Sequence, residues 1–192
     1  MPGTRLHSLL ASIARALQSE QRQAAVAAGL LPVQGAILAY LRDANRYSNT
    51  PQALAEYLAL TKGTVSQSLK LLEAHGWIAR NNDDTDRRVV RLTLTRAGRE
   101  RIDETAVNDW RTAGEALPAT ERRVAEAALE RLLGRWQQAR GGRTFGVCRT
   151  CRHFQPGKSE HLCGLTGETL SERDSSRICR EHTVSEPPKG RL

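Results

Sequence analysis

The stretch TKGTVSQSLKLLEAHGWIARNNDDTDRRVVRLTLT, residues 61–95, constrains the fold of this chain most strongly. Its first half carries apolar residues three and four positions apart behind Thr61, which is the pattern of a capped amphipathic helix. Its last seven residues alternate apolar and polar side chains, as in a half-buried strand. The helical positions are Val65, Leu69 and Leu72, and the strand positions are Val90, Leu92 and Leu94. With the short helix predicted over residues 51–60, this stretch indicates a helix-turn-helix followed by a two-stranded hairpin.

Helical periodicity continues on both sides of this stretch. We predict further helices over residues 4–29, 31–41, 95–117 and 118–140. Gly141 and Gly142 then break the pattern and open a segment of different composition, which ends in EPPKGRL, expected to be disordered. We therefore expect a mainly α protein, with a domain over residues 1–142 whose winged helix-turn-helix core lies at about 51–95, and a small irregular tail over residues 143–192.

The balance of charge indicates the class of partner. The chain has 29 Lys and Arg against 21 Asp and Glu, a formal charge of +8, so nucleic acid is the first expected partner and a basic protein without such a partner is the alternative. Aromatic residues make up only 4%, too few for a platform that stacks single strands. The sequence has no apolar run long enough for a membrane span and no signal peptide at its start, so we expect a cytoplasmic protein.

One face of the helix predicted after Thr61 is polar, and such a helix fits the major groove of double-stranded DNA. Its candidate DNA-contacting residues are Lys62, Thr64, Ser66, Gln67 and Lys70. Ser66 and Gln67 can both donate to and accept from base edges, so we expect them to read the sequence, while the lysines suit phosphates or guanine. The alternative is an ordinary amphipathic surface helix. The hairpin directly after the helix favours DNA.

The loop of the hairpin places carboxylates beside arginines. Asp86 and Arg88 stand two residues apart, on the same side of an extended segment, so the carboxylate can hold the guanidinium. An arginine held in this way can enter a minor groove, where narrow A·T tracts concentrate negative potential. We include Asp86, Arg87 and Arg88 among the candidate DNA-contacting residues. The alternative is a solvated turn with a surface ion pair worth about 0–1 kcal/mol.

Residues 58–103, LALTKGTVSQSLKLLEAHGWIARNNDDTDRRVVRLTLTRAGRERID, resemble the winged helix-turn-helix of MarR-family transcriptional regulators. The shared features are the short helix before Thr61, the recognition helix with its Leu-Glu-Ala-x-Gly-aromatic ending, the Asp-x-Arg of the wing and the sequence LTLTRAG. The match is specific over residues 51–102 and extends through the flanking helices to about 4–140. The resemblance implies a homodimer held by the first helix and the last two. It also implies a recognition helix from each subunit in successive major grooves, Arg88 near the minor groove, and a pseudo-palindromic operator.

Two apolar helix faces support a dimer independently. One runs from Leu6 to Leu17 and the other from Val124 to Trp136. Both are larger than a small winged domain can cover by itself, and without a partner they would form an exposed patch. Packing of these faces within one monomer is the alternative.

All four cysteines lie in the tail, with the spacing C-x2-C-x11-C-x15-C. In a reducing compartment, clustered cysteines are more often metal ligands than disulfides. We therefore predict a four-sulfur metal site made by Cys148, Cys151, Cys163 and Cys179. The tail is poor in core-forming residues, so a bound metal is expected to supply part of its folding free energy.

Zinc is the metal we expect at these cysteines, and an iron–sulfur cluster is the alternative. The CxxC pair suits zinc, whereas the wide spacing of the other two cysteines resembles the cluster ligands of some nucleic-acid enzymes, including a group of DNA-repair glycosylases. His153, His161 and His182 could each replace one thiol, although we expect them at the surface. Two further interpretations are four unrelated buried thiols and two disulfides. A typical family member ends near residue 140, so the tail is a departure.

Together these features predict a homodimeric regulator that binds double-stranded DNA sequence-specifically, usually as a repressor in this family. A small-molecule or redox effector is a further expected partner. We find no catalytic constellation and do not expect an enzyme. The alternatives are an iron–sulfur enzyme that processes nucleic acid, such as a DNA glycosylase, and a module that docks another protein while the winged domain anchors it to DNA.

Overall fold

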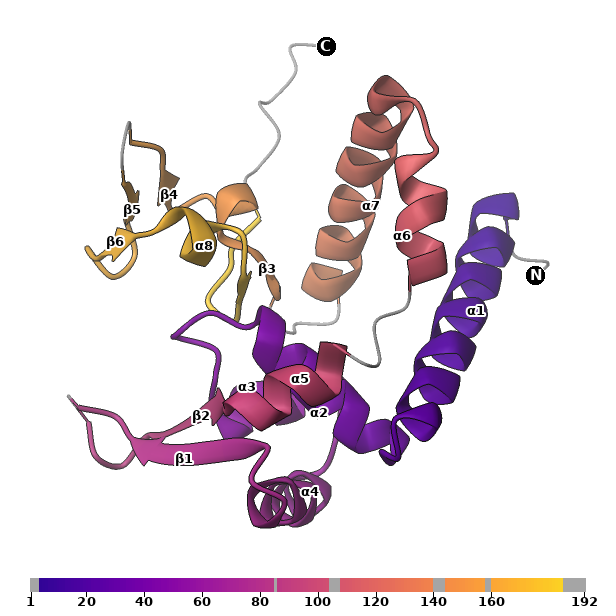
Figure 1. Ribbon diagram of the computed structural model, residues 1–192. Coiled ribbons are helices and arrows are strands. Elements are labelled where there is room, and N and C mark those ends of the chain that lie inside the picture. The colour runs from indigo at the N-terminus through magenta and orange to yellow at the C-terminus, as the bar shows by residue number, and fades with distance from the viewer. Residues whose placement is uncertain (1–3, 85, 104–107, 140–143, 158–159, 185–192) are drawn as a thin grey trace.

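The computed structural model describes residues 4–84, 86–103, 108–139, 144–157 and 160–184. In Figure 1 a winged domain lies at the bottom, long helices project beyond it, and a tail of short strands packs at its upper left. The predicted boundary at residues 142 and 143 and the predicted disorder of EPPKGRL fall outside the described residues.

The winged domain confirms the predicted helix-turn-helix and hairpin. Its elements are α2 (Pro32–Asp43), α3 (Pro51–Leu58), α4 (Lys62–Ala74), β1 (Ile78–Asn82), β2 (Val90–Leu94) and α5 (Arg96–Asp103). Both helices of the helix-turn-helix begin at a threonine cap: the Thr50 hydroxyl accepts a hydrogen bond from the Ala53 N–H at 3.2 Å, and the Thr61 hydroxyl from the Thr64 N–H at 3.2 Å. At the other end of α4, Gly76 adopts φ +69°, the left-handed conformation in which glycine is favoured.

The apolar faces of these elements meet in one core. Its most deeply buried side chains are Ile37, Leu38, Leu54, Leu69, Leu72 and Leu92. The alternation predicted for the second strand is confirmed, because Leu92 and Leu94 are buried while Thr93 is exposed. β1 and β2 pair antiparallel with Ile78 opposite Leu94, so that the apolar side of the hairpin closes the core.

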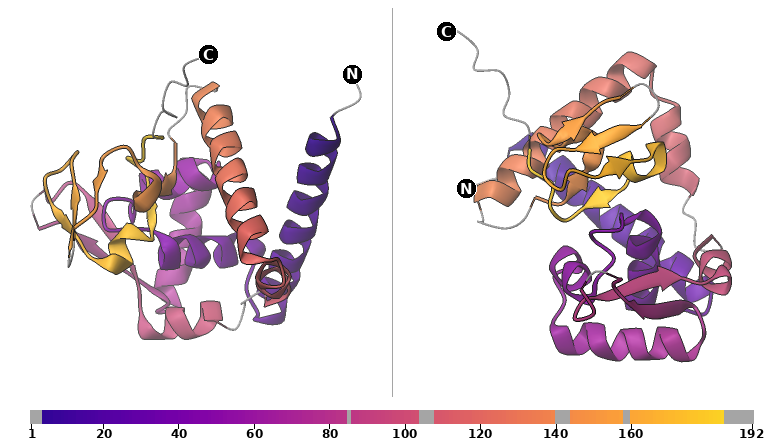
Figure 2. Two further views of the ribbon diagram at one scale, coloured as in Figure 1. Left: turned by 90° about the horizontal axis from the view of Figure 1, so that it is seen from above. Right: turned by 90° about the vertical axis from the view of Figure 1, so that its left-hand side faces the viewer.

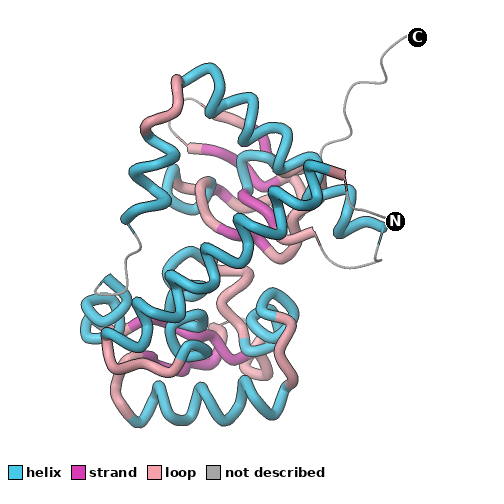
Figure 3. Tube along the Cα trace, turned by 90° about the vertical axis from the view of Figure 1, so that its right-hand side faces the viewer, coloured by secondary structure: helices cyan, strands magenta, loops and turns pink. Residues whose placement is uncertain are grey.

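The projecting helices are α1 (Arg5–Ala27), α6 (Asn108–Glu115) and α7 (Ala119–Ala139) (Figures 1 and 3). The first and last predicted helices are thus confirmed as α1 and α7. The helix predicted over residues 95–117 corresponds to α5, which ends at Asp103, and α6, which starts at Asn108, while residues 104–107 lie outside the described residues. None of the described helices is by itself long and apolar enough to cross a membrane; α1 and α2 pass that test only as a pair bent by 102°.

The tail has more regular structure than we predicted. It contains β3 (Gly146–Val147), the 3₁₀ turn η1 (Cys148–Thr150), β4 (Phe154–Gln155), β5 (His161–Cys163), β6 (Thr169–Leu170), α8 (Glu172–Ser175) and β7 (Ile178–Cys179). β3 pairs with β7, and β5 lies between β4 and β6. Such short pairings bury little apolar surface, so periodicity in the sequence does not reveal them. Figure 2 shows this tail lying over the winged domain.

Candidate nucleic-acid interface and cysteine pocket

α4 lies at the outer edge of the winged domain (Figures 1 and 2). Its inner face buries Val65, Ser68, Leu69 and Leu72 in the core. All five predicted contact residues are exposed on the remaining circumference, namely Lys62, Thr64, Ser66, Gln67 and Lys70. The structure therefore brings these residues together as one polar surface, which we call the α4 polar face.

Thr64 also has a structural partner on this face. Its hydroxyl lies 2.9 Å from the Thr61 hydroxyl, at the first turn of α4. Thr64 therefore belongs to the helix cap as well as to the α4 polar face. Ser66 and Gln67 remain the exposed side chains with both donor and acceptor capacity near the middle of the face.

The wing holds Arg88 as the sequence predicts. The guanidinium donates from Nε to Asp86 Oδ1 at 3.0 Å and from Nη2 to Asp86 Oδ2 at 2.9 Å. These two bonds lower the pKa of the Asp86 carboxyl and raise that of the Arg88 guanidinium. The Arg88 side chain is 90% exposed, and Arg87 beside it is exposed as well. The arginine is thus oriented yet accessible.

A second carboxylate–arginine pair, absent from our sequence-based candidates, supports the wing from its base. Asp83 Oδ2 accepts from Arg91 Nε at 2.6 Å, and Asp83 Oδ1 accepts from the Asp86 N–H at 3.1 Å. Arg91 also donates to the Arg46 carbonyl at 2.6 Å, which joins the wing to the loop between α2 and α3. The sequence signal for this pair was an arginine on the polar side of the second strand, close to the carboxylates of the hairpin loop.

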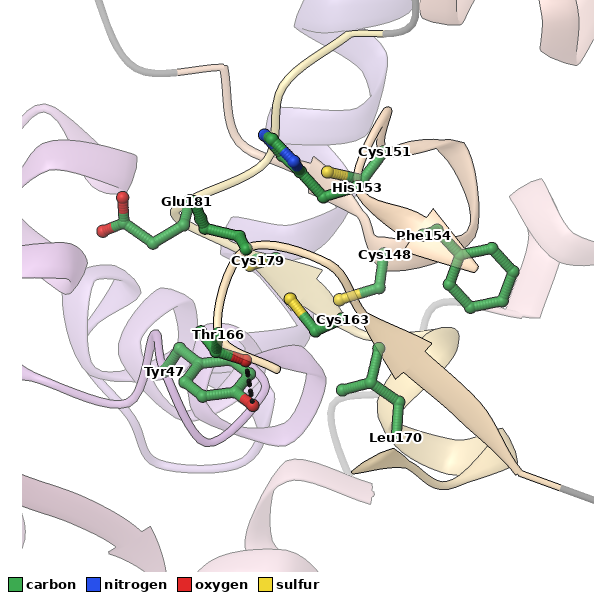
Figure 4. A pocket seen from close by; sticks show the side chains of 11 residues that line it. Tyr47, Cys148, Cys151, His153, Phe154, Cys163, Thr166, Leu170, Cys179 and Glu181 are labelled. Carbon is green, nitrogen blue, oxygen red and sulfur yellow. Dashed lines mark hydrogen bonds between the residues drawn. The ribbon is translucent and has the colours of Figure 1, made fainter. Parts of the chain in front are cut away.

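The four cysteines, spread over 32 residues of sequence, line one small cavity of about 20 Å³ (Figure 4). We call this cavity the cysteine pocket. Tyr47 from the α2–α3 loop, His153, Phe154, Thr166, Leu170 and Glu181 also line it. The structure thus brings the four thiols together around one cavity. All four cysteines carry free thiols in the structure, so it contains neither of the two disulfides considered as an alternative.

Two sulfur atoms of the pocket accept hydrogen bonds from N–H groups. Asn45 Nδ2 donates to Cys148 Sγ at 3.4 Å, and the Thr183 N–H donates to Cys151 Sγ at 3.4 Å. The Cys148 thiol donates in turn to Cys179, which is the main reason why the pKa of Cys179 is lowered to about 6 while that of Cys148 is raised. The pocket thus contains interacting sulfurs from both ends of the tail.

The described side chains do not stand in the geometry of a ready metal site. Among the residues that the structure describes, no three or more His, Cys, Asp or Glu side chains are arranged to hold a metal ion. The expected surface location is wrong for His182, which is 8% exposed and packs on Gly146. His161 is partly buried and hydrogen-bonds Glu172 at 2.8 Å, and His153 alone of the three histidines lines the cysteine pocket.

The long helices leave large apolar side chains uncovered. Those of α1 and α7 that are at least half exposed are Leu6, Leu9, Val26, Val124, Leu133 and Trp136. A groove of about 710 Å³ separates α1 from α7 and is lined from both helices by leucines and by Trp136. The alternative for these faces was packing within the monomer. In the structure, such packing leaves much of the apolar surface of α1 and α7 accessible.

The comparisons agree with this geometry. The family model described as MarR family matches residues 28–89. MepR Q18P from a multidrug-resistant S. aureus clinical isolate is 26% identical with a TM-score of 0.58, over 71% of this chain and 100% of that chain. The S. aureus MepR–DNA complex is 25% identical with a TM-score of 0.51, over 68% and 98%. A MarR transcriptional regulator from Methanosarcina mazei Go1 is 20% identical with a TM-score of 0.55, over 70% and 97%.

No curated protein matches the chain in a sequence search. The three solved structures are aligned over almost their whole length, yet each leaves about three tenths of this chain unmatched. The matched family model spans α2 to the wing, which are the elements that carry the α4 polar face and Arg88. Residues 28–89 of this chain therefore match the MarR-family model, and the fold around them is a winged helix-turn-helix.

Proposed function

We propose that this chain is a transcriptional regulator that binds double-stranded DNA, with α4 in the major groove and Arg88 at the minor groove. The observation that carries the proposal is the α4 polar face, exposed in the same domain as an arginine that Asp86 orients. The similarity to the S. aureus MepR–DNA complex supports it. The net charge of +8 favours the same partner.

The regulator acts as a homodimer in this proposal. Large apolar side chains of α1 and α7 are exposed on both sides of a groove, and a second copy would cover them. In a two-fold dimer the same surface of each subunit forms the contact, and each subunit presents its own α4. Two recognition helices then require an operator with two related half-sites about one helical turn apart.

Selection from a pool of random-sequence duplexes tests this function directly. The full-length protein should enrich a pseudo-palindrome whose half-sites are centred about 10 base pairs apart. Affinity for the enriched duplex should fall steeply as salt is raised, because each lysine or arginine on a phosphate releases counterions. Recovery of sequences without a common motif, or with a single half-site, would contradict a dimer that reads DNA.

Arg88→Ala is expected to weaken binding to the selected operator about 10-fold and to reduce the salt slope by about 1. Preference for A·T pairs at the operator flanks should also decline, because an arginine in a narrow minor groove reads its negative potential. Fluorescence anisotropy on duplexes with A·T or G·C flanks measures both effects. Arg88→Lys, which retains the charge but loses the paired bonds to Asp86, should be intermediate.

Arg111→Ala is the matched control for the wing. Arg111 is an exposed arginine of α6 that pairs with Glu115 at 3.2 Å, outside the winged domain. This variant should bind the operator like the unsubstituted protein. Equal losses in the Arg88 and Arg111 variants would mean that only total charge matters.

Gln67→Ala is expected to relax sequence preference by about 1–3 kcal/mol at one base pair of each half-site. The reason is that an amide can form two hydrogen bonds with adenine in the major groove, and alanine can form none. Binding to single-base operator variants measures this effect, with Gln23→Ala on the exposed surface of α1 as the control. A uniform loss on all duplexes would assign Gln67 to the phosphate backbone.

An effector site is a further part of the proposal. A cavity of about 630 Å³ lies among α1, α2, α3 and α6, and Leu17, Arg22, Tyr40, Arg42, Tyr57 and Trp110 are among its lining residues. Volumes and linings of this kind suit small organic molecules. Trp110 Nε1 is buried and has no hydrogen-bond partner among the described residues, so it is a donor for a polar atom of a ligand.

We also propose a non-enzymatic role, repression and a cytoplasmic location for this chain. MarR-family regulators are generally not enzymes, which favours a regulator over a nucleic-acid-processing enzyme. Repression is the expected outcome of operator binding, and the cytoplasm is the expected location. A docking role of the tail would appear as full operator binding by a protein that has lost regulation when residues 143–192 are removed.

A further inference from the structure

We propose that the cysteine pocket is a binding site for one divalent metal ion held by four thiolates, and that this ion fastens the tail to the winged domain. Zinc is the metal whose chemistry suits the site best, because four-sulfur tetrahedral coordination is typical of structural zinc. The proposed ligands are Cys148, Cys151, Cys163 and Cys179, which all line the pocket. The proposal concerns the tail and does not depend on DNA binding.

The small core of the tail is rich in cysteine. Its buried members are Cys148, Leu170 and Cys179, and Tyr47, Phe154 and Cys163 pack against them. Half of these six residues are cysteines, and none of their thiols is in a disulfide. A core with so little apolar surface cannot offset the ordering entropy of about 40 residues, so a metal is the natural source of the missing free energy.

The four cysteines converge on one place although they come from separate turns and strands of the tail. Cys148, Cys151, Cys163 and Cys179 all line the cysteine pocket (Figure 4). Four thiolates around one position match the ligand set of a structural zinc ion. An iron–sulfur cluster can use the same ligand set, so the test below includes it as a contradicting outcome.

The four sulfurs do not stand in ligand positions in the described part of the chain. Rotation of a cysteine side chain between staggered rotamers moves its sulfur by about 3 Å. Metal binding requires the sulfurs to move to the 2.3 Å distance of a zinc–thiolate bond, and rotation of side chains that already line one cavity contributes to that movement.

Hydrogen-bond donors surround the sulfurs of the cysteine pocket. Four thiolates and a divalent ion carry a net charge of −2, which needs hydrogen-bond donors or cations nearby. Two arginines of the tail have carboxylate partners instead, since Arg149 pairs with Glu172 and Arg180 with Glu56. The donors that reach the sulfurs are Asn45 Nδ2 at Cys148 and the Thr183 N–H at Cys151. N–H groups directed at sulfur are the usual outer partners of thiolate ligands.

The site would also fasten the tail to the loop between α2 and α3. Besides its bond to Cys148, Asn45 donates its N–H to the Ile178 carbonyl at 2.9 Å. The Arg180 N–H donates to Ser48 Oγ at 2.7 Å, and its guanidinium donates twice to Glu56 at 2.7 Å. Ile178 and Arg180 flank the proposed ligand Cys179, so fixing that sulfur fixes the contacts with the loop.

The test uses the full-length chain, purified under reducing and anaerobic conditions and stripped with a chelator. Co²⁺ added alone is expected to bind at one ion per chain, with the visible bands of a tetrahedral ion and the charge-transfer intensity of four thiolates. Zn²⁺ should displace it and protect all four thiols from alkylation. Thiols that react equally with and without Zn²⁺, two disulfides in the reduced preparation, or a brown protein that contains iron and sulfide would each overturn the proposal.

Two variants identify the ligands. Cys163→Ser should lose the four-thiolate spectrum, because serine does not replace a thiolate at such a site. His153→Asn should retain it, since His153 lines the pocket but is not a proposed ligand. Loss of the spectrum in His153→Asn would place an imidazole in the coordination sphere and contradict four thiolates. Should Cys163→Ser not fold, thiol protection in the unsubstituted chain still decides the question.

Hydrogen exchange tests the fastening of the tail. The backbone amides of Asn45 and Arg180 are reporters, because both donate across the boundary between the tail and the α2–α3 loop. Their exchange should be slower with Zn²⁺ bound than after chelation. The amide of Val65 inside α4, which donates to the Thr61 carbonyl at 3.0 Å, should not change and serves as the control. Equal rates at Asn45 and Arg180 in both states would show that the contact forms without metal.

Discussion

Leu133→Glu is expected to convert the protein into a folded monomer with about 100-fold or more weaker binding to its operator. Leu133 is 50% exposed on α7 and lines the groove between α1 and α7 that we assign to the partner subunit. A glutamate there would carry its charge into an apolar contact, where desolvation is unfavourable. Without the partner, the second recognition helix no longer binds as part of the same molecule, and the gain from two linked sites is lost.

Glutamate forms helices about as well as leucine does, so α7 should persist in this variant. Sedimentation velocity reports the subunit number, circular dichroism reports the helix, and anisotropy with the selected duplex reports affinity. Gln138→Glu, which adds the same charge at an exposed position of α7, is the control and should remain dimeric. A Leu133→Glu protein that is still dimeric, with unchanged affinity, would show that this groove is not the subunit contact.

Gly98→Ala is expected to destabilise the winged domain by about 3 kcal/mol. A Cβ at Gly98 would lie 1.9 Å from the Trp77 carbonyl oxygen, and that oxygen also accepts the Thr95 N–H at 3.1 Å. The contact is with backbone, so no side-chain rotation can relieve it. The start of α5 must therefore move away from β1, which also strains the 2.6 Å bond from the Thr95 hydroxyl to the Gly76 carbonyl.

A loss of this size should lower the melting temperature by about 6–12 °C for a chain of this length. Urea unfolding monitored by circular dichroism measures the free energy. Gly63→Ala is the matched control, because its Cβ would meet nothing nearer than the Thr61 hydroxyl at 3.9 Å. Alanine inside a helix should stabilise that variant slightly, by about 0.5–1 kcal/mol. Comparable losses in both variants would contradict the close approach at Gly98.

The close approach of Gly98 also gives a physical reason for one motif of the resemblance to MarR-family regulators, the sequence LTLTRAG. In LTLTRAG, the threonine at position 95 accepts the Gly98 N–H at 3.0 Å and so starts α5, while the glycine lets that helix lie against the end of α4 and the start of β1. The motif thus has a physical role that is separate from any contact with DNA. It sets the position of the wing relative to the helices that follow.

Local pattern was enough to predict the winged domain. The α4 polar face follows from helical periodicity, because burial of Val65, Leu69 and Leu72 leaves Gln67 on the outside. The bond between Asp86 and Arg88 follows from residues two apart in an extended segment. Both features depend on neighbours in the sequence, so the spacing of residues contains the required information.

Features that join distant segments could not be obtained in this way. The contact between Asn45 and Cys148 spans 103 residues, and the bond between Arg91 and the Arg46 carbonyl spans 45. His182 was expected at the surface but is buried, because β3 and β7 bring Gly146 beneath its ring.

The sequence by itself determined the type of each element of the winged domain, which face of α4 is exposed, and which four residues are available as thiolate ligands. Only the tertiary structure decided that these thiols line one cavity and that this cavity lies against the loop joining α2 to α3. The physical reason is how far apart in the sequence the interacting residues lie. Periodicity and capping are set by residues within about four positions of one another, whereas the meeting of Cys148 with Asn45 depends on how the whole chain packs.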